Sequence, residues 1–171
     1  ADSLIHIARP KDSHDRLYPI SMGRYGPTVA VPRILETYRR LGIKQSFFVP
    51  GWCIETYPDA VEAILTGGHE IGHHGYLHED PIDAPDQRAW FEKALEAHHK
   101  YCGGKPSGYR APVYNINQEV LDLLIEHGFR YDSSMMADDI PYRLETSKGQ
   151  LWEMPVHWGT DDWPPFAHYS E

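Results

Sequence analysis

The hydrophobic positions of this chain follow two spacings that alternate along its length. Apolar residues recur three or four positions apart in four segments, each closed by one or two glycines, and this spacing is typical of amphipathic helices. The segments are 31–42, 58–68, 86–104 and 117–128. Short apolar runs that are typical of strands lie between and after them. They are KQSFFVP at 44–50, HEIG at 69–72, SGYRAP at 107–112, FRYDSS at 129–134 and LWEMPVHW at 151–158.

The order helix, glycine, strand recurs three times, which is typical of parallel βα units. The sequence therefore predicts an α/β fold, and both an open doubly wound sheet and a barrel have this order. Asp86 and Asn117 have the side chains of helix N-caps. The run at 44–50 is expected to be a strand buried on both faces. The first 27 residues read as irregular, apart from a weak strand pattern in SLIHI.

The helical spacing also predicts which side chains face the core. In the first helical segment the expected inner face consists of Val31, Ile34, Leu35, Tyr38 and Leu41. In the segment at 86–104 the paired histidines, His98 and His99, are expected on the solvated face.

The composition of the chain argues against some classes of function. Acidic residues outnumber basic ones by 25 to 16, which gives a net charge of −9 and argues against binding to nucleic-acid phosphates. No apolar run approaches the roughly 20 residues of a membrane span, and the first residues do not resemble a signal peptide. Cys53 and Cys102 lack C-x-x-C spacing and are interpreted as isolated thiols, with one disulfide as the alternative. These features favour a reducing compartment, and we expect a cytoplasmic location.

Four of the eleven histidines lie in GHEIGHHGYLHEDP at 68–81 and form two overlapping metal-ligand patterns. His69 and His73 spell H-E-x-x-H, which in a zinc peptidase requires a helix. Glycines surround this stretch and its pattern is that of a strand, on which the two histidines would lie about 13 Å apart. His74 and His78 spell H-x-x-x-H just beyond the strand, where one turn brings both to the same side. The sequence favours this second pair as metal ligands, and the peptidase is the lesser alternative.

Three stretches in a fixed order resemble one known family. GHEIGHHGYLHEDP, GYRAPVYNINQEVLDLLIEHGFRYDSS and PVHWGTDDWP together resemble the polysaccharide deacetylase superfamily, with NodB homology and similar to carbohydrate esterase family 4. The match runs from about Tyr25 to Trp163. It is closest to the branch with peptidoglycan-deacetylase-like, cyclic-imide-hydrolase-like and allantoinase-like members. The resemblance implies a distorted (β/α) barrel in one NodB-like domain over residues 1–171, lacking its first strand and its C-terminal part.

The resemblance assigns roles to particular residues. His74 and His78 would be metal ligands, and Arg110, in the R-x-P motif, would orient a base aspartate. The third ligand and that base would lie in a D-x-D motif just before Ala1, with Asp2 as a substitute ligand, and the acid histidine would lie beyond Glu171. In the D-W motif the catalytic aspartate would be Asp162, for which Asp161 is the alternative, and Trp163 would form a wall of the pocket. Other expected pocket residues are Trp52, Tyr76, Tyr114 and His157.

The implied function is metal-dependent hydrolysis of a non-peptide carbon–nitrogen bond. Zinc suits the ligand set best, and iron, cobalt, nickel and manganese are also compatible with it. The substrate would be an N-acetylated sugar, which places the enzyme in carbohydrate metabolism, or a small cyclic amide or imide. Gly75 stands where polysaccharide-directed members usually have Ser or Thr, and this favours the small amide. A non-catalytic metal-binding fragment of the same fold is the main alternative, and aromatics near WPPF are compatible with a homo-oligomer.

Overall fold

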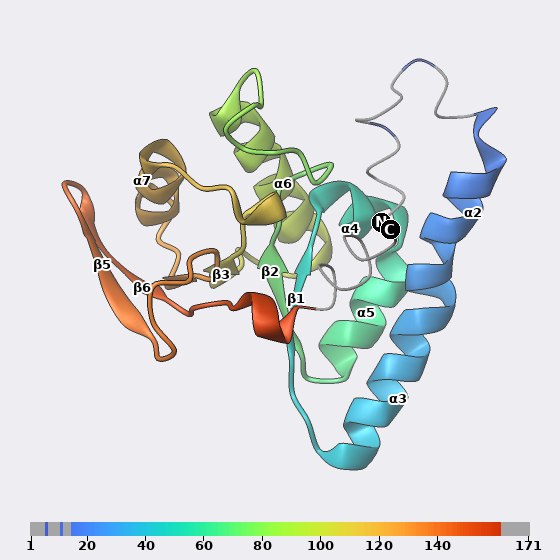
Figure 1. Ribbon diagram of the computed structural model, residues 1–171. Helices are drawn as coiled ribbons and strands as arrows, with labels where there is room; N and C mark the ends of the chain where they lie inside the picture. The colour runs from blue at the N-terminus through green and yellow to red at the C-terminus, as the bar shows by residue number, and fades with distance from the viewer. Residues whose placement is uncertain (1–5, 7–10, 12–14, 162–171) are drawn as a thin grey trace, which may run out of the picture.

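The computed structural model describes residues 6, 11 and 15–161 of the chain (Figure 1). Its strands are β1 (Ser46–Val49), β2 (Glu70–His73), β3 (Gly108–Tyr109), β4 (Tyr131–Asp132), β5 (Tyr142–Thr146) and β6 (Gly149–Glu153). Its α-helices are α2 (Leu17–Tyr25), α3 (Val31–Leu41), α4 (Gly51–Thr56), α5 (Pro58–Thr66), α6 (Gln87–Tyr101) and α7 (Gln118–Glu126). Shorter helical turns are η2 (Gly26–Ala30), η3 (Pro112–Tyr114) and η4 (Trp158–Thr160). The chain is therefore a mixed α/β protein.

The six strands form one sheet in the order β1-β2-β3-β4-β6-β5. The pairs β1–β2, β2–β3, β3–β4 and β4–β6 are parallel, and β5 pairs with β6 as an antiparallel hairpin. In the part of the chain that the structure describes, this sheet is open between β1 and β5. The hairpin and α3 lie at opposite ends of the molecule (Figure 1). The predicted α/β class with parallel βα units is confirmed.

Local chemistry explains where the helices begin and end. The side chain of Asp86 accepts a hydrogen bond from the Ala89 amide at 2.9 Å, and α6 begins at the next residue. Asn117 caps α7 in the same way. After α3, Gly42 adopts φ +67°, a left-handed conformation that closes the helix and that glycine adopts without steric cost. Both predicted caps and this helix end are confirmed.

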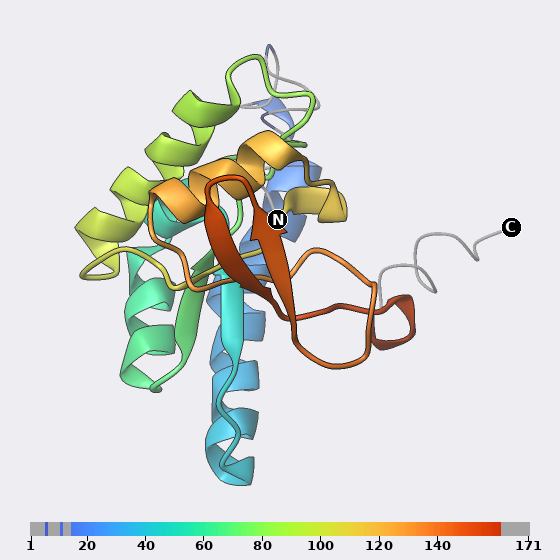
Figure 2. The same ribbon diagram turned by 90° about the vertical axis from the view of Figure 1, so that its left-hand side faces the viewer.

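The core has two parts, and α6 contributes to both. One part joins α6, α7 and the strands from β3 to β6, and it contains Phe91, Leu95, Tyr109, Ala111, Val120, Leu123, Leu124, Phe129 and Leu151. The other joins α4, α5, α6 and β2 through Ile54, Val61, Ile64, Ile71 and Ala97. On the hairpin side, α7 packs against β6 (Figure 2). Helix α6 is therefore buried on more than one side.

This burial corrects several expectations about exposure. His98 is fully buried, because α6 packs on two sides, whereas His99 is exposed as predicted. In α3, Ile34 is 38% and Leu41 66% exposed, so only part of the predicted inner face packs. Strand β1 is half-buried along its length and not enclosed on both faces.

Three of the helices and strands, α2, α4 and β5, were absent from the sequence prediction. Residues 17–25 form α2, although no residue of this helix is buried and its apolar pattern is weak. Strand β5 forms because it pairs with β6 across five residue pairs, and such pairing is a tertiary property. The SLIHI stretch lies almost wholly outside the described residues.

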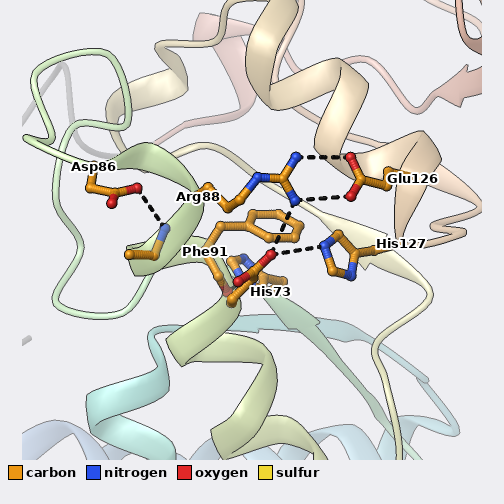
Figure 3. A network of polar contacts seen from close by, with 8 residues as sticks. His73, Asp86, Arg88, Phe91, Glu126 and His127 are labelled. Carbon is orange, nitrogen blue, oxygen red and sulfur yellow. Dashed lines mark hydrogen bonds and ion pairs between the residues drawn. The ribbon is translucent and has the colours of Figure 1, made fainter.

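A surface network joins α6 to α7 (Figure 3). The Arg88 guanidinium binds both carboxylate oxygens of Glu126 at 2.9 Å, and it also contacts Glu92 at 3.1 Å. Nε2 of His127 lies 3.6 Å from the Glu92 carboxylate. The side chains are about half exposed, so water and salt screen these pairs and each contributes little to the stability. The network orients the two helices, and the apolar core supplies most of the stability.

Two further observations concern the cysteines and membranes. Cys53 and Cys102, both in the described part of the chain, form no disulfide with one another. Among the helices of residues 15–161, none has the length and apolar character needed to cross a membrane.

Two leucines test how the stability is distributed. Leu124 is fully buried in the α7 core, whereas Leu41 at the end of α3 is largely exposed. Leu124→Ala should lower the free energy of unfolding by about 2–5 kcal/mol, because a buried side chain is lost and a cavity remains. Leu41→Ala should change it by less than about 0.5 kcal/mol. Urea denaturation followed by circular dichroism measures both, and equal losses would contradict the described core.

Candidate metal centre

The two histidine patterns lie on different kinds of structure. The segment that spells H-E-x-x-H is not helical, because Glu70–His73 is strand β2. Nδ1 of His69 accepts a hydrogen bond from the Gln45 amide, whereas Nε2 of His73 donates one to the Phe91 carbonyl on α6. The His69 and His73 side chains thus bond to different parts of the protein and do not form a pair of metal ligands. The zinc-peptidase alternative is therefore wrong.

His74 and His78 lie together just beyond the carboxyl end of β2. Their ring centroids are 4.7 Å apart and the ring planes are nearly perpendicular. Nδ1 of His74 lies 2.7 Å from the Arg110 carbonyl oxygen. Because a carbonyl only accepts, Nδ1 carries the proton and Nε2 keeps a lone pair. Nδ1 of His78 is buried and has no hydrogen-bond partner in the described structure.

The electrostatic environment keeps both imidazoles neutral. Burial, followed by the neighbouring His78, lowers the pKa of His74 to about 3. Burial also lowers the pKa of His78. A neutral imidazole with a free lone pair is the form that binds a metal. The pair therefore fits two positions of a metal site, although no group of three or more metal-binding side chains occurs among the described residues.

Arg110 follows β3 and lies beside the histidine pair. Its Nε donates to the Ser133 carbonyl at 2.9 Å, and Nη2 donates to the Ser133 hydroxyl at 2.7 Å. The guanidinium also lies over the Phe48 ring, 4.4 Å from its centroid. Nη1 has no hydrogen-bond partner among residues 15–161. One face and one edge of the guanidinium are thus fixed, and one donor group is left for another acceptor.

Sequence reasoning missed a buried carboxyl pair that supports this arrangement. The parallel register of β4 and β6 places Asp132 opposite Glu153, and both are fully buried. The Ser134 hydroxyl donates to Asp132 at 2.7 Å and accepts from the Ala111 amide at 2.9 Å. Ala111 directly follows Arg110, so the carboxyl pair is linked to the arginine through one serine. Two acidic residues at neighbouring strand ends were the only sequence pattern that could have indicated the pair.

The two carboxyl groups hold one proton between them. Burial, and then the adjacent Asp132, raise the pKa of Glu153 to about 9. Oε1 of Glu153 accepts from the amides of Ser134 and Met135 at 3.0 and 3.1 Å, whereas its buried Oε2 has no hydrogen-bond partner in the described structure. A protonated Glu153 removes one of the two buried charges at neutral pH, which reduces the cost of burying two acids.

The predicted pocket residues occupy varied positions. The Tyr114 hydroxyl donates to Asp161 at 2.8 Å, and its ring contacts Trp158. Tyr76 is only 8% exposed and its hydroxyl donates to Glu55, so its side chain belongs to the packing between α4 and α6. Substrate contact by either tyrosine stays a prediction.

The remaining predicted pocket residues are at least partly exposed or lie outside the described residues. Trp52 is half-buried in α4, and its amide donates to the Tyr76 carbonyl. His157 is exposed and caps η4 by accepting from the Gly159 amide. Asp162 and Trp163 lie outside the described residues.

Parallel βα units that carry a neutral histidine pair at a strand end define an α/β protein with a candidate divalent-metal centre. The polysaccharide deacetylase family model matches residues 25–131, and the chain belongs to this family. The resemblance predicted from the three motifs is therefore confirmed.

Individual relatives agree with this membership. A peptidoglycan deacetylase of Helicobacter pylori is 33% identical over 172 residues, a match that covers 85% of this chain and 59% of the relative. A crystal structure described as a polysaccharide deacetylase from Mycobacterium smegmatis has 40% identity and a TM-score of 0.89, over 95% of this chain and 57% of that one. The PuuE allantoinase structure has 27% identity and a TM-score of 0.72, over 80% of this chain and 46% of that one. The chain thus spans less than two thirds of each of these relatives.

The raised pKa of Glu153 predicts a pH-dependent stability. Between about pH 4.5 and 9 the native state keeps a proton on Glu153 that the unfolded state has lost, so the contribution of this group to the free energy of unfolding falls as the pH rises. The slope from this group is at most about 1.4 kcal/mol per pH unit. Glu153→Gln keeps an acceptor for the amides of Ser134 and Met135 and removes the titrating group. Guanidinium denaturation from about pH 7.5 to 9, where the buried histidines are neutral in both the native and the unfolded state, should therefore show a flatter decline in this variant.

Glu145→Gln on β5 is the matched control, because Glu145 is exposed in the same hairpin. It should leave the wild-type slope unchanged. Identical slopes in wild type and Glu153→Gln would contradict a shared proton.

Proposed function

We propose that this protein is a metal-dependent hydrolase that cleaves non-peptide amide bonds and removes the acetyl group from an N-acetylated sugar. The observation that carries the proposal is the His74–His78 pair. Two neutral imidazoles lie 4.7 Å apart at a parallel strand end, one fixed by a backbone carbonyl and the other with an unsatisfied buried nitrogen. An orphaned buried nitrogen costs about 1–3 kcal/mol, and such a cost is expected where the group serves a ligand.

A divalent ion bound by His74 and His78 would polarise the amide carbonyl and lower the pKa of water. Zinc suits imidazole ligands, and iron, cobalt, nickel and manganese accept the same donors. We propose that an aspartate from elsewhere in the protein completes the ligand set, since two histidines alone bind weakly. Within residues 1–171, Asp2 is the substitute candidate from the sequence, and it lies outside the described residues.

Arg110 is proposed to hold the carboxylate that acts as general base. Its guanidinium is fixed by Ser133 and by the Phe48 ring, and Nη1 has no partner among the described residues. A fixed cation with one open donor would bind a carboxylate in one geometry and keep it ionised at neutral pH. Asp162 is proposed to tune the acid histidine, and Trp163, Trp52, Tyr114 and His157 to line the pocket.

Two substrate classes are supported by different observations. The relative from H. pylori is a peptidoglycan deacetylase, and this supports an N-acetylated glycan. The similarity to PuuE allantoinase, together with glycine at position 75, supports a small cyclic amide or imide as the second candidate. Both classes have an amide carbonyl that the same residues could engage. We propose the cytoplasm as the location, because Cys53 and Cys102 form no disulfide with one another.

Substitution of the histidines tests the proposal. In the intact protein, His74→Ala or His78→Ala should weaken zinc binding by more than about 100-fold, because even groups that merely orient ligands contribute 10–100-fold. Both variants should also lose acetate release from an N-acetylglucosamine oligosaccharide and ring opening of a cyclic imide. Metal content is measured by plasma mass spectrometry, and hydrolysis by chromatography of both substrates.

His99→Ala is the control, because His99 is an exposed histidine on α6. It should keep both its metal and its activity. Stoichiometric metal in both ligand variants would disprove the assigned site, and an intact wild type with metal but no hydrolysis would favour the non-catalytic alternative.

A further inference from the structure

The two histidines of the candidate metal centre are carried by one tight turn, residues 74–78, that has an unfavourable backbone. Gly75 has φ +68° and His78 has φ +70°. Glycine adopts this left-handed conformation freely, whereas for other residues it costs about 1–2 kcal/mol. Left to itself, the chain at His78 would relax to a negative φ and move the imidazole away from His74. Some other group must therefore hold the turn.

The carbonyl groups of the turn are bound by the start of α4. The Gly51 amide donates to the Gly75 carbonyl and the Trp52 amide donates to the Tyr76 carbonyl, both at 2.9 Å. These bonds attach the turn to the helix that follows β1. They do not involve the amides of the same turn, of which that of Gly75 donates to Nδ1 of His73.

The amides of Tyr76 and Leu77 are bound by Glu79, the residue directly after His78. Its carboxylate accepts from the Tyr76 amide through Oε1 at 2.9 Å and through Oε2 at 3.1 Å. Oε2 also accepts from the Leu77 amide at 2.6 Å. A hydrogen bond to a charged group contributes about 1.5–3 kcal/mol, which is enough to offset the strain at His78. Both oxygens are used, so the group fits a carboxylate better than an amide.

The space that Glu79 fills explains the glycine at position 75. A Cβ at this position would lie 2.9 Å from Oε1 and 3.2 Å from Cδ of Glu79, and 3.2 Å from Cγ of Pro112. The first distance is shorter than real Cβ contacts, so a side chain at position 75 and the Glu79 carboxylate compete for the same space. Gly75 and Glu79 are therefore one structural unit.

We infer that Glu79 is the positioning residue of the histidine pair: its carboxylate closes the turn and thereby holds His78 at ligand distance from His74. This rests on the proposed function, in which the two histidines bind a metal. Glu79 itself directs its oxygens to backbone amides and not to a substrate or ion. Its role is to preorganise the ligands, so that metal binding does not have to order the turn.

Variants of Glu79 in the intact protein test the inference. Glu79→Ala removes all three bonds, and Glu79→Gln replaces one carboxylate oxygen by a donor that faces backbone donors. In the metal-free protein, hydrogen exchange of the Tyr76 and Leu77 amides, followed by NMR, should accelerate by at least about tenfold in both variants. Zinc affinity, measured by competition with a chelating dye, should fall by about 10–100-fold.

The control is Glu55→Gln. Glu55 contacts the same turn, but through the Tyr76 hydroxyl and not through the backbone. It should leave the two amides protected and the zinc affinity unchanged. Accelerated exchange with unchanged zinc affinity would overturn the inference, and so would unchanged exchange in Glu79→Ala. If the wild type binds zinc no better than His78→Ala, the proposed function is overturned instead. Hydrogen exchange of the metal-free protein still decides, in that case, whether Glu79 holds the turn.

A double substitution tests the shared space independently of metal. In the wild-type background, Gly75→Ala should lower the thermal unfolding midpoint for two reasons. The added Cβ would clash with the Glu79 carboxylate, and alanine disfavours the positive φ at this position. In the Glu79→Ala background only the φ effect and the Pro112 contact remain, so the decrease should be smaller. Equal decreases in both backgrounds would show that the two residues are independent and would overturn the inference.

Discussion

The parallel pairing of β1, β2 and β3 is the constraint on which the candidate site depends. The register aligns Val49 with His73 and His73 with Tyr109, so the three strands end at the same level. The backbone hydrogen bonds just beyond these strand ends continue from this register. The Arg110 amide donates to the His73 carbonyl, and the Gly51 amide donates to the Gly75 carbonyl. The site is thus made from the first residues beyond three strand ends, where the sheet's own hydrogen bonds still fix the backbone.

The position of these residues just beyond three strand ends explains why their side chains contact one another. Arg110 connects three strands: it follows β3, stacks over Phe48 of β1 and donates to Ser133 after β4. His74 in turn takes its orientation from the Arg110 carbonyl. Each contact is short and partly or fully buried, so rotation of one side chain would disturb the next.

The sequence predicted the parts of the fold that depend on local chemistry. The caps at Asp86 and Asn117 and the end of α3 at Gly42 need only neighbouring residues, and all three were predicted. The burial of His98 and the pairing of β5 depend on which surfaces meet in three dimensions, and the sequence pattern did not contain them. Within the site, the H-x-x-x-H spacing and strand end indicated the histidine pair. The role of Glu79 was hidden, because an acidic residue after a histidine has no distinctive spacing and its partners are backbone amides.

The buried Asp132–Glu153 pair has a consequence for folding itself. At about pH 8, where histidines are neutral in the native and the unfolded state alike, the unfolded chain carries both carboxyl groups ionised, whereas the native chain holds one proton between them. Folding therefore draws a proton from the solvent, and the buffer must supply it. The heat of folding measured in a calorimeter then includes the ionisation enthalpy of that buffer. The same protein will give different apparent enthalpies in phosphate and in Tris, although its conformation and its packing are identical in both.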